Sequence, residues 1–210
     1  MYFAASIFKI LKKNNMRKIV LSLSVVAALA LVSFSPKPKT NLEQNFTVSA
    51  DKSKIDFVGS KTGDYHTGYF PIKSGTIRVD GGKLVGGNFV INVAGLKVTD
   101  AAGDRLQGHL ATADFFDISK FGEATFNITS VKYITDNKVS ITGDLTLKGV
   151  KAPVTFPAII RSAERNDKEK GFFAEAFFPF DRTVFGINYG IGAVDTEVQL
   201  AIHLYGNKQF

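Results

Sequence analysis

The sequence predicts an all-β domain in which about eight to ten short strands form an antiparallel barrel or sandwich, with one or two short helical turns. Apolar and polar residues alternate with period two through most of the chain, and glycine-containing turns separate the alternating segments. All but three of the 19 phenylalanines lie beyond residue 35, and tryptophan is absent. This aromatic excess indicates an apolar interior larger than an ordinary core requires, and a barrel of about eight strands has room for one small ligand.

Residues 1–35 predict a targeting segment outside the folded domain. Met16 is followed by Arg17 and Lys18, and residues 19–34 form an apolar run rich in Leu, Val and Ala. A positive start before a short apolar run is typical of a secretory signal peptide, whereas a membrane-spanning helix needs about 20 apolar residues. We therefore expect translation to start at Met16 and the protein to be exported to the periplasm.

A single domain over residues 46–210 is expected to follow a linker over residues 36–45. Seven of the 26 basic residues and none of the 19 acidic residues precede residue 40, so the rest of the chain is formally neutral. A neutral domain without a basic run gives no electrostatic support for nucleic-acid binding. The chain has no cysteine, which excludes disulfides and cysteine-ligated metal sites.

The first half of the domain is expected to consist of strands joined by tight turns. The expected strands cover residues 55–58, 64–72, 76–80 and 83–93. Gly81-Gly82 is a two-residue hairpin signal between the last two strands. Gly86-Gly87 lies inside the last strand and indicates a bulge or bend, as barrel corners need.

The stretch 104–126 interrupts this pattern. We expect Asp114 to cap a single helical turn, because its carboxylate can accept the free N–H groups at a helix start. Phe115 and Phe116 are adjacent and cannot both lie on one face of a strand or helix. We therefore expect a short aromatic lid or plug here, and the alternative is a packed connection between two strands.

In the second half, residues 139–147 give the clearest alternation of the chain. We expect the side chains of Ile141, Leu145 and Leu147 to be buried and those of Ser140, Thr142 and Asp144 to be exposed, since a one-residue slip would exchange the two sets. Further strands are expected over 154–160, 171–180 and 194–204. Segment 171–180 is apolar on both faces, so its pattern leaves open which face lines the interior.

The residues offer little support for catalysis or for a metal site. His66, His109 and His203 lack the spacing of metal ligands, and no serine lies in a nucleophile elbow. We therefore expect a binding protein without a metal or cofactor. An enzyme that acts on a lipid or hydroperoxide, with His109 or Tyr69 taking part, stays open as the alternative.

Several motifs, in their order and spacing, resemble the YceI family of bacterial lipid-binding proteins over roughly residues 46–204. The main matching segments are Ile55-Asp56-Phe57, Gly68-Tyr69-Phe70, Gly108-His109-Leu110, Asp114-Phe115-Phe116-Asp117, Ala124-Thr125-Phe126, Gly143-Asp144-Leu145 and Asp181-Arg182-Thr183. The chain departs from the family pattern at Gly122, where proline is common, and in lacking tryptophan near the first strand.

The resemblance implies a lipocalin-like antiparallel β-barrel that is exported to the periplasm and often forms a homodimer. Its central tunnel would bind a polyisoprenoid, an isoprenoid quinone or another long-chain lipid, with transient contact to a membrane or a membrane partner. The resemblance implies no catalytic residues. A structural envelope protein, whose interior is filled by its own side chains, is a further alternative.

The side chains expected to line the lipid-binding interior are apolar and mostly aromatic. They are Phe70, Phe89, Phe115, Phe116, Phe126, Ile141, Phe156, Phe173, Phe177 and Phe185. Arg105 and Arg182 are candidates for binding a polar head group, because guanidinium matches the geometry of phosphate or carboxylate. The alternative for these two arginines is an ion pair with Asp104 and Asp181.

Overall fold

The structure is a computed structural model that describes residues 43–166 and 169–208. The predicted targeting segment over 1–35 and most of the predicted linker lie outside the described residues. Gln44 and Asn45, expected in the linker, already belong to the first strand.

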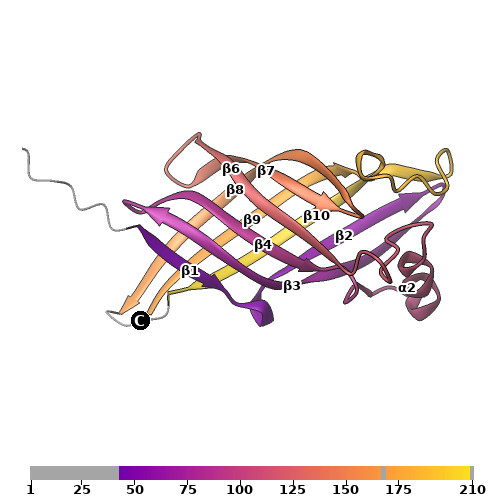
Figure 1. Ribbon diagram of the computed structural model, residues 1–210, viewed down its shortest axis with the longest axis horizontal. Coiled ribbons are helices and arrows are strands. Elements are labelled where there is room, and N and C mark those ends of the chain that lie inside the picture. Colours follow the sequence, from indigo (N-terminus) through magenta and orange to yellow (C-terminus); the bar gives the residue numbers. More distant parts are fainter. Residues whose placement is uncertain (1–42, 167–168, 209–210) are drawn as a thin grey trace, which may run out of the picture. The chain divides into compact units, whose positions relative to one another are not determined.

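Ten strands, one α-helix and two short 3-10 helices make up the described chain (Figure 1). The strands are β1 (Gln44–Val48), β2 (Lys54–Lys61), β3 (Asp64–Asp80), β4 (Lys83–Asn92), β5 (Lys97–Val98), β6 (Glu123–Tyr133), β7 (Lys138–Leu147), β8 (Val150–Asn166), β9 (Glu169–Asp181) and β10 (Val194–Asn207). The helices are η1 (Ala50–Lys52), α2 (Gly103–Ala111) and η2 (Arg182–Phe185).

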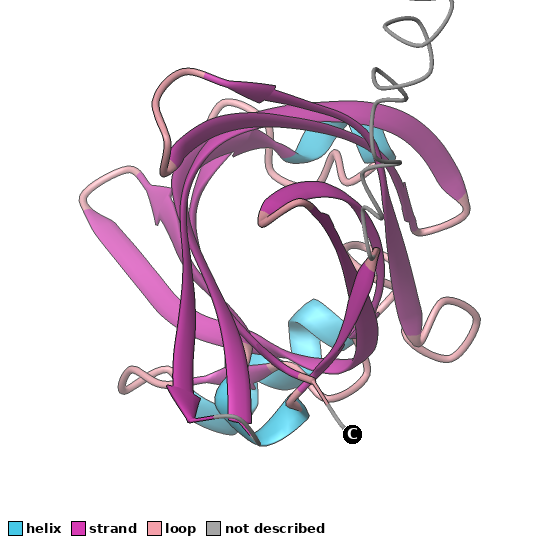
Figure 2. Ribbon diagram, turned by 90° about the vertical axis from the view of Figure 1, so that its left-hand side faces the viewer, coloured by secondary structure: helices cyan, strands magenta, loops and turns pink. Residues whose placement is uncertain are grey.

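The strands close into an antiparallel ring of eight positions, which confirms the predicted barrel (Figure 2). Around the ring the order is β10, β2, β3, β4, β6, β7, β8 and β9, and β9 pairs back onto β10. The short β1 shares the position of β2: it lies between β3 and β10, and η1 separates it from β2. Closure leaves the ring without an edge strand, because each of its eight positions pairs with a neighbour on both sides.

The backbone agrees with the sequence at the predicted Gly81-Gly82 hairpin and near the predicted Gly86-Gly87 bulge. Gly81 and Gly82 have positive φ angles of 56° and 80°, which a two-residue hairpin of the observed twist requires. The register of β3 against β4 shifts opposite the predicted bulge at Gly86-Gly87. The two expected strands over 64–72 and 76–80 are one long strand, β3, with an irregularity between Ile72 and Ser74.

Strand β7 has its apolar face inside, as predicted, although its outer face is less exposed than expected. Ile141 and Leu147 are buried, and Leu145 is half-buried. The outward residues Ser140, Thr142 and Asp144 are half-buried because side chains of β8 cover them: the Oγ1 atoms of Thr142 and Thr155 are 2.9 Å apart, and Lys151 Nζ lies 2.9 Å from a carboxylate oxygen of Asp144.

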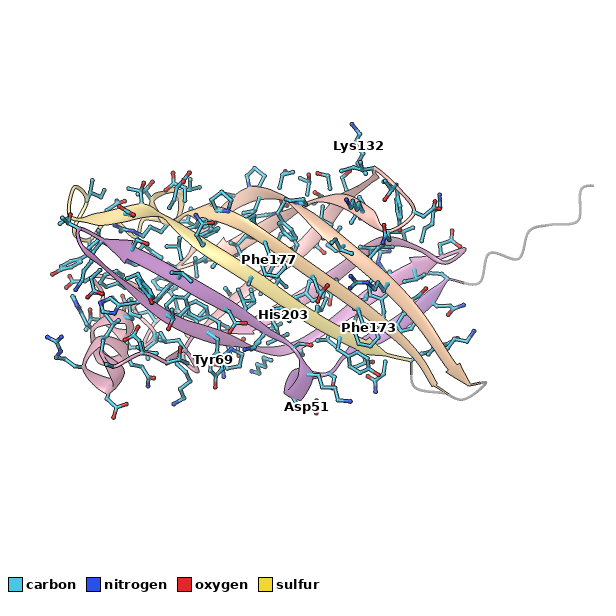
Figure 3. The ribbon with its side chains drawn as sticks, turned by 180° about the vertical axis from the view of Figure 1, so that it is seen from behind. Asp51, Tyr69, Lys132, Phe173, Phe177 and His203 are labelled. Atoms are coloured by element: carbon cyan, nitrogen blue, oxygen red, sulfur yellow. The ribbon has the colours of Figure 1, made fainter. Side chains whose placement is uncertain are left out.

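Strand β9, which is apolar on both faces, turns Phe172 and Phe178 inward and Phe173 and Phe177 outward. The expectation that Phe173 and Phe177 line the interior is therefore wrong. They are 40% and 64% exposed and lie across the outer face of the sheet, near the Tyr205 and His203 side chains of β10 (Figure 3). The closing ladder fixes this choice, because it sets Phe173 opposite Tyr205 and Phe172 opposite Gly206.

The two ends of the barrel are built differently. At the end that holds β1, large side chains occupy most of the interior: Ile77 and Val139 are fully buried, and the rings of Phe46 and Phe172 are 5.9 Å apart. The space left beside Ile77 and Phe172 is a cavity of about 120 Å³. The other end carries α2 and the loop that follows it (Figure 1). This difference places the ligand-sized space toward the α2 end.

Close packing of aromatic rings against glycine backbone gives a direct test of the fold. A Cβ atom at Gly143 would lie 2.4 Å from the Phe126 ring and 2.6 Å from the carbonyl oxygen of Asn127, so Gly143→Ala should lower the free energy of unfolding by about 1–3 kcal/mol. Gly59→Ala is the matched control, because nothing lies within 4 Å of its added Cβ. Urea unfolding of both variants measures the difference, and equal free energies would contradict this packing.

Candidate functional site

The barrel holds two neighbouring, mainly apolar cavities. The outer cavity has a volume of about 430 Å³ and lies at the α2 end, and the inner one has a volume of about 120 Å³. They share five lining side chains: Ile55, Ile91, Leu145, Phe180 and Leu200. An elongated molecule that enters the outer cavity would therefore meet the inner one along the barrel interior.

A ladder of four phenylalanine rings lines the inner cavity. Phe89, Phe126, Phe156 and Phe178 come from β4, β6, β8 and β9, and consecutive ring centroids are 6.3, 5.7 and 4.6 Å apart. The Phe156 and Phe178 rings are nearly parallel, at 9°. These four rings present a continuous apolar wall without a hydrogen-bonding group.

Helix α2 covers the outer cavity with one of its faces. Its cavity-facing residues recur at the spacing of one helix face: Ala102 just before it, then Arg105, Leu106, His109 and Leu110. This period-3.6 signal is present in the sequence, but the helical turn expected in this stretch begins at Asp114, after the helix that the structure shows.

The anchor of α2 is Asp100, not Asp114. The carboxylate of Asp100 accepts hydrogen bonds from the backbone N–H groups of Ala102 and Thr67, each at 2.7 Å, and these bonds hold its pKa below the usual range. The helix ends at Ala111, so the expectation that Asp114 caps a turn is wrong. Asp114 instead lies 3.2 Å from Nε2 of His109.

The adjacent Phe115 and Phe116 separate into two roles, as their spacing predicts, although both contact the outer cavity. Phe115 is buried against His109 and Tyr189, with ring centroids 5.1 Å from each. Phe116 packs edge-on against Phe70 at 5.3 Å. The segment therefore covers the end of the barrel as a lid: one ring contacts the loop before β10, and the other contacts the barrel wall.

Arg182 is a structural residue in this geometry. Its buried guanidinium donates hydrogen bonds to the carbonyl oxygens of Ile187, Val194 and Asp195, at 2.5–3.0 Å. Burial lowers its pKa, and the charges of Asp181 and Asp195 oppose that shift. The carboxylate of Asp181 accepts bonds from Thr183 instead, which lower the pKa of Asp181. The Arg182 guanidinium, which also lines the outer cavity, therefore bonds three backbone carbonyl oxygens rather than the Asp181 carboxylate.

Arg105 occupies a different position. It is exposed, it lines the outer cavity, and it makes no hydrogen bond or ion pair with any residue that the structure describes, so the expected pair with Asp104 is absent. Lys61 and His66 also line this cavity. Nδ1 of His66 lies 3.3 Å from Asp100, which orients the imidazole. The mouth thus places a free cation beside an apolar interior.

The structure distributes the predicted lining residues over three places. Phe70, Phe115 and Phe116 line the outer cavity, and Phe89, Phe126, Ile141 and Phe156 line the inner one. Phe173 and Phe177 lie outside, and Phe185 is buried against Phe180 without lining either cavity. The lining residues that sequence reasoning missed include Phe57, Leu106, Phe178, Phe180 and Tyr189.

The described residues give little support for a metal site or for a catalytic role of Tyr69. Among the residues that the structure describes, no group of three or more His, Asp or Glu side chains could hold a metal ion. Tyr69 lines neither cavity, and the ammonium group of Lys54 lies over its ring at 5.6 Å. Within the same described ranges, no helix has the length and apolar character that crossing a membrane requires.

Comparison with known proteins agrees with this architecture. The model of the YceI-like domain family matches residues 46–205. Protein YceI of Escherichia coli O157:H7 is 38% identical over 125 residues, which are 58% of this chain and 62% of that protein. A UPF0312 protein of Pseudomonas putida F1 is 38% identical over 104 residues, 48% of this chain and 53% of the relative. The chain thus aligns with little more than half the length of these relatives.

Solved structures show the same fold. BcnA of Burkholderia cenocepacia superposes with a TM-score of 0.61 at 26% identity, covering 75% of this chain and 98% of that one. A polyisoprenoid-binding domain from Saccharophagus degradans gives a TM-score of 0.56 at 14% identity, with 78% and 98% coverage. With a family model spanning most of the chain and a closed eight-position barrel, this protein belongs to the YceI family.

Proposed function

We propose that this protein binds one long apolar lipid, such as a polyisoprenoid or isoprenoid quinone, inside the barrel and carries it in the periplasm. The observation that carries the proposal is the pair of neighbouring apolar cavities, one of them lined by four phenylalanine rings. The outer cavity, with a volume of about 430 Å³, lies within the range of about 300–1,000 Å³ that is typical of binding pockets, and the inner cavity adds about 120 Å³ beside it.

The energetics favour a chain without specific polar contacts. Burial of each CH₂ group contributes about 0.8 kcal/mol, so a few isoprene units outweigh the ordering cost of association. The Saccharophagus relative, described as a polyisoprenoid-binding domain, supports the ligand class through a shared fold.

A polar head group would lie at the mouth, near Arg105. This guanidinium is exposed, lines the outer cavity and has no partner among the described residues, so binding an acceptor would break no existing bond. Arginine recognises phosphate and carboxylate through paired N–H donors. The proposed ligand therefore has an apolar chain and a head group that accepts hydrogen bonds.

Catalysis inside the barrel has weaker support than binding. His109 lines the outer cavity, but its Nε2 atom lies 3.2 Å from Asp114 and its ring packs edge-on between Phe115 and Tyr189. A side chain held in this way stabilises the lid. A carrier role also accounts for the apolar lining better than an envelope protein with a filled interior.

Ligand binding should stabilise the fold. Organic extraction of the purified protein, followed by mass spectrometry, should yield a long-chain lipid. The delipidated protein should melt several degrees lower, and an added polyprenyl lipid or quinone should restore the midpoint, since a ligand at a hundredfold excess over its Kd adds about 2.7 kcal/mol.

Two phenylalanines provide the matched controls for that experiment. Phe116→Asp should abolish the restoration, because it places a carboxylate beside the ligand chain in the cavity. Phe177→Asp should leave it intact, because Phe177 is 64% exposed on the outer face. The proposed function would be rejected if no lipid could be extracted and if added lipid raised the melting midpoint of neither the delipidated wild-type protein nor the Phe177→Asp variant.

The two arginines should behave in opposite ways. Arg105→Gln should leave the free energy of unfolding unchanged within about 0.5 kcal/mol, as is usual for surface substitutions, yet weaken binding of lipids with an anionic head group. Arg182→Met should cost about 3 kcal/mol or more, because three carbonyl groups lose a buried donor at about 1 kcal/mol each at least. Urea unfolding and lipid titration of both variants separate head-group recognition from structural support.

Export is proposed on the sequence of the first 35 residues. The mature protein should begin between residues 31 and 41 and appear in the periplasmic fraction, because a signal peptide is removed during secretion. Intact-mass measurement on protein from that fraction gives the start directly. Retention of residues 16–35 in the purified protein would contradict a free periplasmic carrier.

A further inference from the structure

Large apolar side chains are exposed at the end of the barrel where the outer cavity lies. They are Tyr65, Val184, Tyr189 and Ile191, with exposed fractions of 61%, 51%, 44% and 59%. We call these four residues the apolar rim. They belong to the start of β3, to η2 and to the loop before β10, all of which lie at the α2 end of the barrel (Figure 1).

The segments that carry the rim are fastened to one another. The N–H group of Thr62, in the β2–β3 turn, donates to the carbonyl oxygen of Ala193 at 3.0 Å. Lys61 and Val194 are paired across the β2–β10 ladder. Arg182 joins η2 to the start of β10 through its bonds to Val194 and Asp195. The exposed apolar side chains are therefore held on a fixed scaffold.

Tyr189 connects the apolar rim to the outer cavity. Tyr189 is both 44% exposed and part of the cavity lining, and its ring lies 4.8 Å from His109 and 5.1 Å from Phe115 of the lid. Exposed apolar residues scattered singly are ordinary on proteins, whereas a contiguous group at a cavity mouth marks an interaction site. The apolar rim therefore lies at the end of the barrel where the outer cavity lies, and Tyr189 belongs to both.

We propose that the barrel docks mouth-first on a phospholipid bilayer through the apolar rim, so that a lipid passes between bilayer and cavity without crossing water. This inference rests on the proposed lipid-binding function. Tyrosine rings favour the head-group level of a bilayer, and aliphatic side chains such as Ile191 favour the acyl boundary. The unpartnered Arg105 at the same mouth is complementary to lipid phosphates.

The absence of tryptophan from the chain makes a site-specific test possible. Ile191→Trp places a single fluorophore on the rim, and Phe177→Trp places one at a similarly exposed position on the side of the barrel. The full-length protein is mixed with phosphatidylcholine vesicles, with and without phosphatidylglycerol. The emission of the indole at position 191 should shift to the blue and resist aqueous quenchers, while that at position 177 should not change.

Transfer kinetics provide the second readout. Ile191→Asp combined with Tyr65→Asp should lower vesicle affinity and the rate of quinone uptake from vesicles about tenfold, which corresponds to about 1.4 kcal/mol. The amount of quinone bound at equilibrium from detergent solution should stay the same, because neither substitution alters the inner cavity. Phe177→Asp should change neither quantity.

The outcomes separate this inference from the function on which it rests. Equal emission shifts at positions 191 and 177, or no shift at either, would overturn rim docking while extractable lipid kept the proposed function standing. A protein that shifts only at position 191 yet contains and binds no lipid would support docking and reject the carrier role. Unaltered uptake by the rim variant would indicate a protein partner at the mouth and would overturn bilayer docking.

Discussion

The structure depends on one ladder, in which β9 pairs with β10 over eleven consecutive positions from Glu197–Asp181 to Asn207–Gly171. This pairing converts an open sheet into a ring, which removes both sheet edges and fixes the circumference. Because successive side chains of a strand point to opposite faces of the sheet, the register of this ladder also decides which alternate side chains of β9 and β10 point inward. The apolar interior follows from that closure.

A closed ring of eight strands encloses more space than the side chains of this protein fill, and the unfilled space is larger at one end. Large side chains such as Ile77, Val139 and Phe172 leave a cavity of about 120 Å³ toward the end that holds β1, whereas about 430 Å³ stays open at the other end. The open end needs a cover, which α2 and the Phe115–Phe116 segment provide. The more tightly packed end and the candidate site are thus two ends of one barrel, and the same strands run through both.

Polar chemistry at the open end is divided between support and recognition. Asp100 holds the start of α2 to β3, and Arg182 holds η2 to β10, each through backbone groups that would otherwise lack partners. Since these residues are committed to the scaffold, the cation left for a ligand is Arg105, which is exposed and has no partner among the described residues. Burial and hydrogen-bond satisfaction therefore distinguish two arginines that look equivalent in the sequence.

The all-β class, the Gly81-Gly82 turn, the bulge near Gly86 and the inward face of β7 could be predicted from the sequence, because they follow from local backbone preference and period two. The separation of Phe115 from Phe116 also followed from adjacency alone.

The inward face of β9 could not be predicted from its pattern, since both faces are apolar and the register against β10 chooses between them. The tertiary structure also decided the role of Arg182, whose three partners are backbone carbonyls with no side-chain signature. Local patterns predict the strands and turns. Pairing between distant strands decides which side chains of β9 face the cavities, and the backbone carbonyl groups of Ile187, Val194 and Asp195 decide the role of Arg182.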